Sequence, residues 1–443
     1  MKSNTSPGSI EEFLDAALSP YHTAGKIVDR LEDAGFTELD ERDRWEVRPG
    51  TGYFVRRNGS AVLAFVAGSS SPADAGFRIV GAHTDSPALK LKTSAECDAH
   101  GYRVVPVEVY GSPIVSTWLD RDLVVAGRLV TRRDGVVQSV LARLPGTPAR
   151  VPNLAIHLNR TVNEGFQYNS QDHLRAIVGL AGSGDGAANG KADRSSRLVA
   201  ALAAVCGLAA DEVLGADVFL TDGQPAGRSG LASEFLVSGR IDNAAGCFTT
   251  LEALLRAPRA ASTAVAFFAD AEEVGSRTAT GADSGFLRDT LDRVVALAGD
   301  GGPEESFRAR ARSIVVSNDA TNAVHPNFAE KHDSSYRPVP NGGPVVKLSA
   351  QHRYATTGAT HGIFADACRV AGVPLQVIVP RSDIPSGSTI GPMTAAWTGV
   401  PTVDVGIPII AMHSIRETAG YDDVEFMTRA LVDFYSSDAQ LGR

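Results

Sequence analysis

Acidic and histidine side chains directly follow several apolar, β-branched stretches of this sequence. The stretches are RIVGAHTDS with His83 and Asp85, VAFFADAEEVGS with Glu272 and Glu273, and SIVVSNDA with Asp319. In open α/β sheets, ligands bind at the carboxyl ends of the strands. We therefore expect these side chains to meet at one edge of a sheet.

Two further residues extend this set of candidate ligands. Asp242 stands at the start of a helix-like segment in SGRIDNAAG, and His413 follows another apolar run in VDVGIPIIAMHS. Mixed histidine and carboxylate ligands suit Zn, Mn or Co, whereas an all-oxygen set would indicate Mg or Ca. Five or so ligands exceed the needs of one tetrahedral ion, so we expect two ions about 3.5 Å apart, bridged by one carboxylate.

The adjacent acids Glu272 and Glu273 indicate a division of labour. On an extended or loop backbone, successive side chains point in different directions. One of the two carboxylates can therefore bind metal while its neighbour faces a metal-bound water as general base.

Each of these features has a simpler structural interpretation. A single histidine such as His83 is more often a hydrogen-bonded surface or core residue, and a Glu pair is more often solvated. Asp242, before an Ala-rich helix, has the residue type of an N-cap. The joint placement favours a site, because solvated acids have no reason to follow buried strands repeatedly.

The elements that must position these residues can be read from the apolar pattern. We expect a helix over 24–35 and strands over 53–55, 61–66 and 77–80. After residue 234, strands and helices alternate: helices over 244–256 and 363–370, and strands over 262–268, 312–316, 375–379 and 402–407. Such alternation predicts an α/β layer with a mostly parallel sheet.

The middle of the chain has a different pattern of apolar residues. Between about residues 93 and 234, shorter β-branched stretches occur over 103–109, 122–129 and 136–144. These stretches predict an antiparallel, β-rich insert. The simplest architecture is one α/β domain built from both ends of the chain and interrupted by this insert.

Composition excludes several classes of protein. The 443 residues are 43% hydrophobic and 21% charged, which excludes a disordered or collagen-like chain. A net charge of -9 leaves no basic surface for nucleic acid. The most apolar run, 198–210, is shorter than the roughly 20 residues that a membrane span needs. The four Cys form no CxxC pair and no secretory signal is legible, so we expect a cytoplasmic protein with reduced thiols.

Seven motifs occur in the order in which they occur in aspartyl aminopeptidases. They are GAHTDSPALKLK, GRIDNAAG, EEVGS, NAVHPNF, QHRYATTG, SGSTIGPMTA and AMHSIRE. The chain resembles that metallopeptidase family from about Ser19 to Tyr435. The resemblance implies a zinc-aminopeptidase-type α/β catalytic domain over 1–92 and 236–443, with an inserted dimerisation domain over 93–235.

The resemblance also assigns the metal ligands. His83, Asp242 and Asp319 would hold one ion, and Asp242, Glu273 and His413 would hold the other, so that Asp242 is the bridge. Zn is the expected metal, with Mn or Co as alternatives.

The implied reaction is hydrolysis of the N-terminal peptide bond. Glu272 would be the general base, and Asp85 would orient the imidazole of a metal ligand. Family members prefer N-terminal Asp or Glu, so a basic group must meet the acidic side chain. Lys347 is the expected residue, with His325 and His352 as further candidates. The alternative for Lys347 is a solvated lysine at a strand edge.

The resemblance implies a homo-oligomer, a dodecamer built from dimers. His157 in AIHLNR would reach the active site of a neighbouring subunit. The chain departs from the family at Ala271 and Asn322, where a His is usual, and at Ser386, where a Cys is usual. These departures bear on metal preference and on acidic specificity.

Other functions would fit parts of this pattern. A broader aminopeptidase or a related two-metal dipeptidase or deacylase would use similar ligands. A non-catalytic assembly protein could keep the same fold, but the complete set of candidate ligands and the base argue against it.

Overall fold

The chain divides into two compact units. The computed structural model describes residues 8–182, 196–298 and 301–437. The larger unit comprises residues up to Asp85, Ala226–Met412 and the chain from Glu417 onward, and the smaller unit comprises Ser86–Pro225 and His413–Arg416. The dimerisation role expected for the insert stays a prediction.

A nine-stranded sheet forms the centre of the larger unit. Its order is β1 (Thr37–Glu38), β2 (Gly52–Arg57), β3 (Ala61–Val66), β15 (Thr263–Ala269), β4 (Phe77–His83), β16 (Ile314–Asn318), β20 (Thr402–Gly406), β18 (Val345–Lys347) and β19 (Gln376–Ile378). The central strands β15, β4, β16 and β20 are parallel to one another. This arrangement confirms the predicted α/β fold with a mostly parallel sheet.

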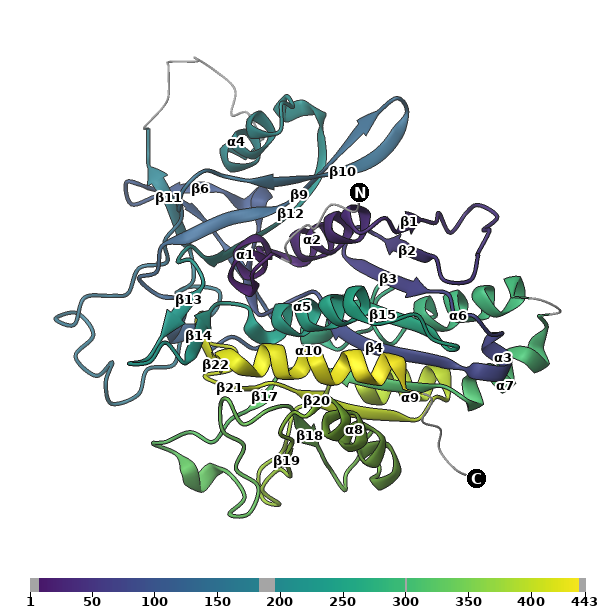
Figure 1. Cartoon of the computed structure of the whole chain (residues 1–443). Helices are drawn as coiled ribbons and strands as arrows, with labels where there is room; N and C mark the ends of the chain where they lie inside the picture. Colours follow the sequence, from purple (N-terminus) through teal and green to yellow (C-terminus); the bar gives the residue numbers. More distant parts are fainter. Residues whose placement is uncertain (1–7, 183–195, 299–300, 438–443) are drawn as a thin grey trace. The chain divides into compact units, whose positions relative to one another are not determined.

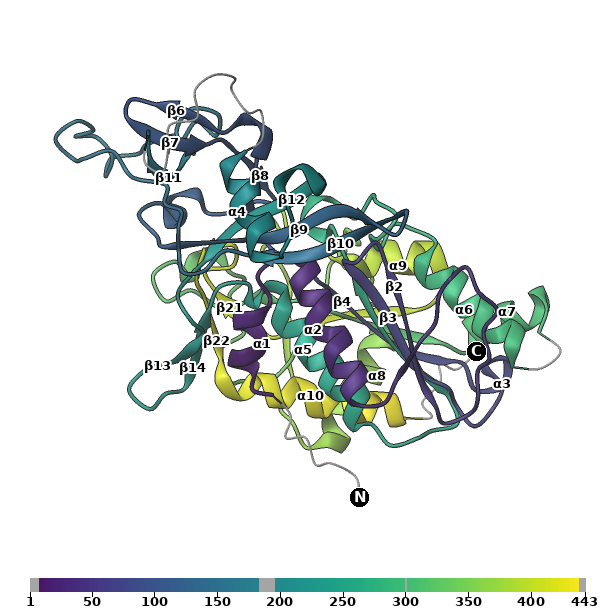
Figure 2. The same cartoon turned by 90° about the horizontal axis from the view of Figure 1, so that it is seen from above.

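Helices cover both faces of this sheet, and successive strand residues point to opposite faces. On β4, Val80 and Ala82 belong to the apolar cluster that contains residues of α1 (Ile10–Ala16), α2 (Pro20–Asp33), α5 (Ile241–Arg256), α8 (Gly358–Ala371) and α10 (Tyr421–Ser436). Ile79 belongs to the cluster on the other face, with residues of α6 (Phe286–Leu297), α7 (Pro303–Ala311) and α9 (Ile390–Thr398). Helices α5 and α10 lie side by side on one face, as both views show (Figure 1, Figure 2). Because the central strands are buried on both faces, their sequences are almost continuously apolar.

Capping residues explain where the helices begin. Helix α2 begins four residues before the expected start because Ser19 accepts a hydrogen bond from the backbone of His22 and Pro20 occupies the first turn. Helix α8 likewise begins at Gly358, because Thr357 caps it, rather than at residue 363.

The smaller unit contains two sheets in which every pairing is antiparallel. The larger of the two has the order β10 (Val136–Arg143), β9 (Leu123–Arg133), β12 (Val213–Asp222), β5 (Ala88–Leu91) and β8 (Val107–Tyr110); the other is β11 (Ala176–Leu180), β7 (Tyr102–Val105) and β6 (Cys97–Ala99). The antiparallel character predicted for the insert is confirmed. The stretch 103–109 forms two strands rather than one, because Pro106 lacks the N–H that a continuous ladder needs.

A second sheet of the larger unit leads into the candidate site. It comprises β13 (Gly227–Ser229), β14 (Phe235–Ser238), β22 (Glu417–Gly420), β21 (Pro408–Ile410) and β17 (Thr321–Asn322). Strand β14 precedes α5, and β17 follows β16. Within the described residues, no helix has both the length and the apolar character that a membrane span requires.

Candidate metal centre

Strand register brings His83 level with Asp319. In the parallel sheet, β4 lies between β15 and β16, and His83 is the last residue of β4. Gly81 pairs with Ser317, so the residue two positions beyond Ser317 lies level with His83. The Nε2 atom of His83 is accordingly 3.3 Å from Oδ1 of Asp319. The predicted meeting of polar side chains at the strand ends is observed for this pair.

Asp242 reaches the same imidazole from the start of α5. The helix begins after Arg240 in a left-handed conformation, and Asp242 itself has non-helical dihedral angles. The backbone N–H of Asp242 donates to Oε2 of Glu417, at 2.9 Å, and Oδ1 of Asp242 lies 3.4 Å from Nε2 of His83. The N-cap position of this helix is occupied by Arg240 rather than by Asp242, so the N-cap interpretation of Asp242 is wrong.

Two asparagines tie the start of α5 to the end of β16. The Asn243 amide donates to the carbonyl oxygen of Asn318, and the Asn318 amide donates to the carbonyl oxygen of Gly246 and to the hydroxyls of Thr249 and Thr250. A Cβ atom at Gly246 would lie 2.2 Å from Oδ1 of Asn243, so only glycine fits. Sequence reasoning missed this tie, although Asn243 and Gly246 lie in the GRIDNAAG motif.

The glutamate pair follows β15 in a short 3₁₀ turn, Glu272–Val274. The backbone N–H groups of Glu272 and Glu273 donate to the two carboxylate oxygens of Asp85, both at 3.1 Å. The Nδ1 atom of His83 donates to the backbone carbonyl of Asp85, also at 3.1 Å. Asp85 therefore orients both the imidazole and the glutamate pair.

The donor set fits a divalent metal ion. One ligand atom from each of His83, Asp242 and Glu273 lies within 4.8 Å of the others. Because Nδ1 of His83 donates to a carbonyl, neutral His83 presents the lone pair of Nε2 toward the carboxylates of Asp242 and Asp319. That arrangement is repulsive unless a proton or a metal cation lies between the atoms.

The pKa values of His83, Glu272 and Glu273 are all raised, which reflects the excess of negative charge in this buried cluster. Burial opposes protonation of His83, but hydrogen bonds with Asp242, Asp319 and Asp85 raise its pKa well above the ordinary value. Burial, with the neighbouring carboxylates, raises the pKa of Glu272 to about 8 and raises the pKa of Glu273 well above its ordinary value. A bound cation would reverse these shifts by favouring the ionised carboxylates.

Lys347 compensates part of this charge. Its side chain is only 3% exposed, its Nζ donates to the carbonyl of Ala320 at 2.7 Å, and Nζ lies 3.7 Å from Oδ2 of Asp319. Burial alone would raise the pKa of Asp319, but Lys347 and His83 lower it to about 2. The interpretation of Lys347 as a solvated strand-edge lysine is wrong.

The remaining predicted residues are four histidines. His413 belongs to the smaller unit, and its Nδ1 donates to the carbonyl of Ser112 at 3.0 Å, which leaves the lone pair on Nε2 as a metal ligand requires. His157 is exposed in the smaller unit, His325 packs against Phe328, and His352 is exposed. The roles of these four histidines stay predictions.

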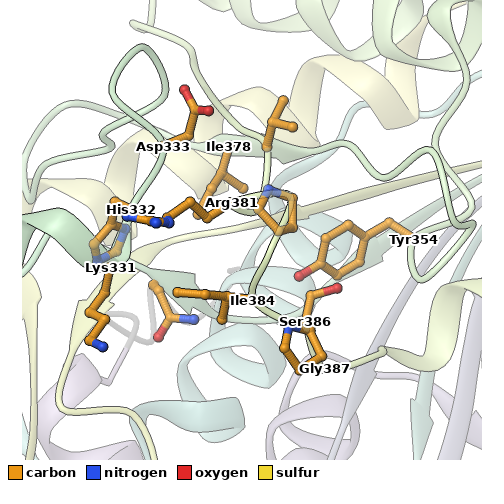
Figure 3. Close-up of a pocket in the computed structure, with 13 residues that line it drawn as sticks. Lys331, His332, Asp333, Tyr354, Ile378, Arg381, Ile384, Ser386 and Gly387 are labelled. Carbon is orange, nitrogen blue, oxygen red and sulfur yellow. The ribbon is translucent and has the colours of Figure 1, made fainter.

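A cavity of about 420 Å³ lies within the larger unit, and Tyr354 forms part of its wall. The Tyr354 ring is 5.6 Å from Nζ of Lys347, which in turn contacts Asp319. Figure 3 shows Tyr354 beside Ser386, with Lys331 and His332 on the opposite side. Burial raises the pKa of Tyr354. Sequence reasoning did not single out Tyr354, although it lies in the QHRYATTG motif.

Comparison with known protein families identifies the relatives of this chain. Residues 13–435 match the family described as aminopeptidase I zinc metalloprotease, M18. The chain belongs to the M18 family. The predicted membership in a family of zinc aminopeptidases is therefore confirmed, and this M18 chain is a metallo-aminopeptidase at the level of the family.

Individual relatives agree with this assignment. The chain is 43% identical over 437 residues to a probable M18 family aminopeptidase 2 of Pseudomonas syringae pv. syringae, with 99% of both chains covered. It is 44% identical over 426 residues to the protein of the same name in Pseudomonas entomophila, covering 96% of this chain and 97% of that protein.

Solved structures show the same fold. The structure of an Ape4 and Nbr1 complex contains a chain that is 33% identical, with a TM-score of 0.93 over 96% of this chain and 84% of that one. The S. cerevisiae mApe1 dodecamer is 26% identical, with a TM-score of 0.83 over 96% of this chain and 95% of that one. An M18 aminopeptidase of Thermotoga maritima, at 21% identity and a TM-score of 0.82 over 96% of this chain and 94% of that one, shares the fold.

Proposed function

We propose that this M18 chain is a two-metal aminopeptidase that removes acidic residues from the N-termini of peptides. The observation that supports the proposal best is the buried convergence of one imidazole with several carboxylates on the carboxyl edge of the parallel sheet. Burying so many carboxylates is unfavourable without compensating cations.

The ligands divide between two ions. His83 and Asp319 would hold the first ion, Glu273 would hold the second, and Asp242 would be shared by both. When bound, the two ions polarise the scissile carbonyl and make a water molecule acidic enough to attack it near neutral pH. Zn is the proposed metal, in keeping with the name of the family, with Mn or Co as alternatives.

Glu272 acts as the general base that takes the proton of the attacking water and delivers it to the leaving amine. Its backbone N–H is held by Asp85, so the position of the base is coupled to the orientation of His83. Because Glu272 and Glu273 are adjacent in a 3₁₀ turn, their side chains point in different directions. This geometry supports separate roles for the two carboxylates.

Lys347 supplies the positive charge that attracts an acidic substrate side chain. It is buried beside Asp319, so its ammonium group lies next to the proposed metal centre. The positive charges of Lys347 and the metal ions outweigh the net charge of -9 at close range.

A broader specificity is the second candidate, and one observation favours it. The ammonium group of Lys347 is already engaged with Ala320 and Asp319. Two of the positions that depart from aspartyl aminopeptidases, Asn322 and Ser386, also line the cavity beside Tyr354. A weaker preference for acidic residues would follow from both features.

We further propose that the chain assembles into a homo-oligomer, a dodecamer built from dimers through the β-rich insert. The mApe1 relative of S. cerevisiae forms a dodecamer. Within such an assembly His157 would reach a neighbouring active site, and His413 would complete the ligands of the second ion. A cytoplasmic location remains the expectation from the sequence.

One experiment separates these candidates. The purified protein is analysed for bound metal and then assayed with peptides that begin with Asp, Glu or Leu, before and after chelation. We expect metal-dependent turnover that favours Asp and Glu, and restoration by added Zn, Mn or Co. Equal rates on all three peptides would indicate the broader aminopeptidase, whereas cleavage of N-blocked substrates would indicate a deacylase. Absence of both metal and turnover would contradict the enzymatic proposal.

A further inference from the structure

Asp404 is a buried carboxylate that receives hydrogen bonds from two separate loops. It lies on β20 and is fully excluded from solvent. The backbone N–H of Ala355 donates to its Oδ2 at 2.6 Å, and the Thr389 hydroxyl donates to its Oδ1 at 2.5 Å. Its own backbone N–H donates to the hydroxyl of Thr356 at 2.8 Å. Both loops are therefore attached to the central sheet at one residue.

The two loops form walls of the cavity described above. Tyr354 directly precedes Ala355, and Ser386 lies three residues before Thr389; Tyr354 and Ser386 both line the cavity (Figure 3). A second hydrogen bond, from the Ser388 hydroxyl to the carbonyl of Arg353, joins the loops directly at 3.2 Å. Movement of either loop would change the shape of the cavity.

Asp404 also lies opposite Lys347. Strands β18 and β20 are antiparallel, and Val345 pairs with Gly406 and Val346 with Val405. The next position in this register places Lys347 opposite Asp404, and opposite residues of an antiparallel pair project to the same face of the sheet. Asp404 thus lies opposite the lysine of β18 and is also hydrogen-bonded to the two loops that carry Tyr354 and Ser386.

The Asp404 carboxylate is closely packed against the start of α9. A Cβ atom at Gly391 would lie 2.2 Å from Oδ1 of Asp404, so no larger residue fits there without displacing the carboxylate. Thr389 completes the arrangement, because its hydroxyl donates to Asp404 and accepts the backbone N–H of Gly391 at 3.2 Å. The start of α9 is consequently held against β20.

From these contacts we propose that Asp404 is a positioning residue for substrate selection. It holds the Tyr354 loop and the Ser386–Thr389 segment at a defined distance from Lys347, and so determines how well an acidic side chain is accepted. The inference rests on the proposed preference for acidic N-termini. Asp404 itself touches neither substrate nor metal in this account.

The test compares three variants with the wild-type protein. Asp404→Asn removes one acceptor. Thr389→Val keeps the side-chain shape but removes the donor to Asp404 and the acceptor for the N–H of Gly391, and Thr389→Ser keeps the hydroxyl that makes both bonds. Thr428→Val is the matched control, because Thr428 is a buried threonine of α10 whose hydroxyl donates to a backbone carbonyl. KM and kcat are measured for peptides beginning with Asp and with Leu, together with bound metal.

Loss of one such hydrogen bond should raise KM for the Asp peptide by about tenfold in Asp404→Asn and Thr389→Val. We expect kcat to change by less than about threefold and KM for the Leu peptide to stay nearly constant, because the metal ligands are not altered. Thr389→Ser should restore selectivity, Thr428→Val should not affect it, and the metal content should match the wild type throughout.

Other outcomes would overturn the inference. Equal losses on both peptides, or loss of metal, would show that Asp404 only stabilises the fold. If Asp404→Asn does not fold, the comparison of Thr389→Val with Thr389→Ser decides the question alone. A wild-type enzyme without acidic preference would contradict the proposed function, whereas a preference that survives in Thr389→Val would contradict this inference alone.

Discussion

Strand β4 in the larger unit buries all seven of its residues, whereas strand β10 in the smaller unit exposes six of its eight. The difference follows from their places in the sheets. β4 has a parallel neighbour on each side and helices on both faces, but β10 is an edge strand with one neighbour. Its exposed apolar residues are Val136, Val137 and Leu141.

This contrast indicates two different uses of a strand. At the end of β4, buried hydrogen bonds hold His83 in one orientation, as a metal site requires. Among the described residues, one edge of β10 pairs with no other strand, and its apolar side chains are exposed, so it is a surface on which another chain can pack. Glu272 and all the proposed metal ligands except His413 belong to the larger unit, whereas assembly is expected from the smaller unit. The following predictions test that division.

Removal of the Asp242 carboxylate, the proposed bridge, should have the largest effect. In Asp242→Ala we expect metal affinity to fall by more than about 100-fold, since even partners that only orient a ligand contribute 10- to 100-fold. Turnover should fall below detection at ordinary metal concentrations. Metal per chain and peptide hydrolysis are measured at several Zn concentrations.

The matched control for this variant is Asp74→Ala, which removes an exposed carboxylate of the same unit. Its metal content and turnover should equal those of the wild type. Normal metal content in Asp242→Ala would refute the bridging role, and the chemistry would have to lie elsewhere in the chain.

Substitution of Glu272 should separate metal binding from catalysis. Glu272→Gln should keep the metal and lower kcat by about 10²- to 10⁴-fold, the usual contribution of a general base. Glu273→Gln, one residue away, should instead lose metal. Near-normal kcat in Glu272→Gln, or equal metal loss in both variants, would remove the proposed division between the two glutamates.

The exposed edge of the smaller unit should affect assembly rather than chemistry. Val137 and Leu141 are four residues apart and therefore lie on the same face of β10. In the double variant Val137→Lys and Leu141→Lys we expect smaller assemblies by light scattering, with unchanged metal per chain. Val370→Lys is the control, since Val370 is an exposed valine of α8 in the larger unit. An unchanged assembly would place the contacts outside this edge.

The sequence predicted the parts of this molecule that depend on local pattern. The buried strands of the larger unit are continuous apolar runs, and polar residues such as His83 and Asp319 end them abruptly. Positions of helix ends were less accurate, because a single cap such as Ser19 followed by Pro20 outweighs the apolar pattern.

Long-range contacts decided what the local pattern left open. The backbone N–H of Asp242 donates to Glu417, which is distant in sequence, so the local pattern around Asp242 could not predict how its backbone is held. The burial of Lys347 depends on Asp319 and on the neighbouring strand β20. The local sequence around Lys347 does not predict these contacts. The local sequence around Tyr354 likewise does not predict its place beside the cavity.

The smallest predicted effect concerns another buried carboxylate of the larger unit, Asp423 at the start of α10. Burial raises its pKa from 3.8 to about 7, although the backbone N–H groups of Asn341 and Gly343 lower it. Between pH 4 and 7 the folded chain therefore keeps a proton that the unfolded chain releases. The resulting stabilisation is complete below pH 4 and is lost as the pH rises through about 7.

In Asp423→Asn this pH-dependent contribution to the free energy of unfolding is absent. We expect its Tm to fall less than that of the wild type between pH 5 and pH 7.5, and its Tm at pH 5 to be lower because one acceptor is lost. Glu425→Gln, a substitution of an exposed carboxylate on the same helix, should follow the wild-type curve. Parallel curves for Asp423→Asn and wild type would mean that Asp423 is ionised throughout, held by its two backbone donors at 2.7 and 2.8 Å. The larger unit would then keep this carboxylate charged without a metal, unlike those around His83.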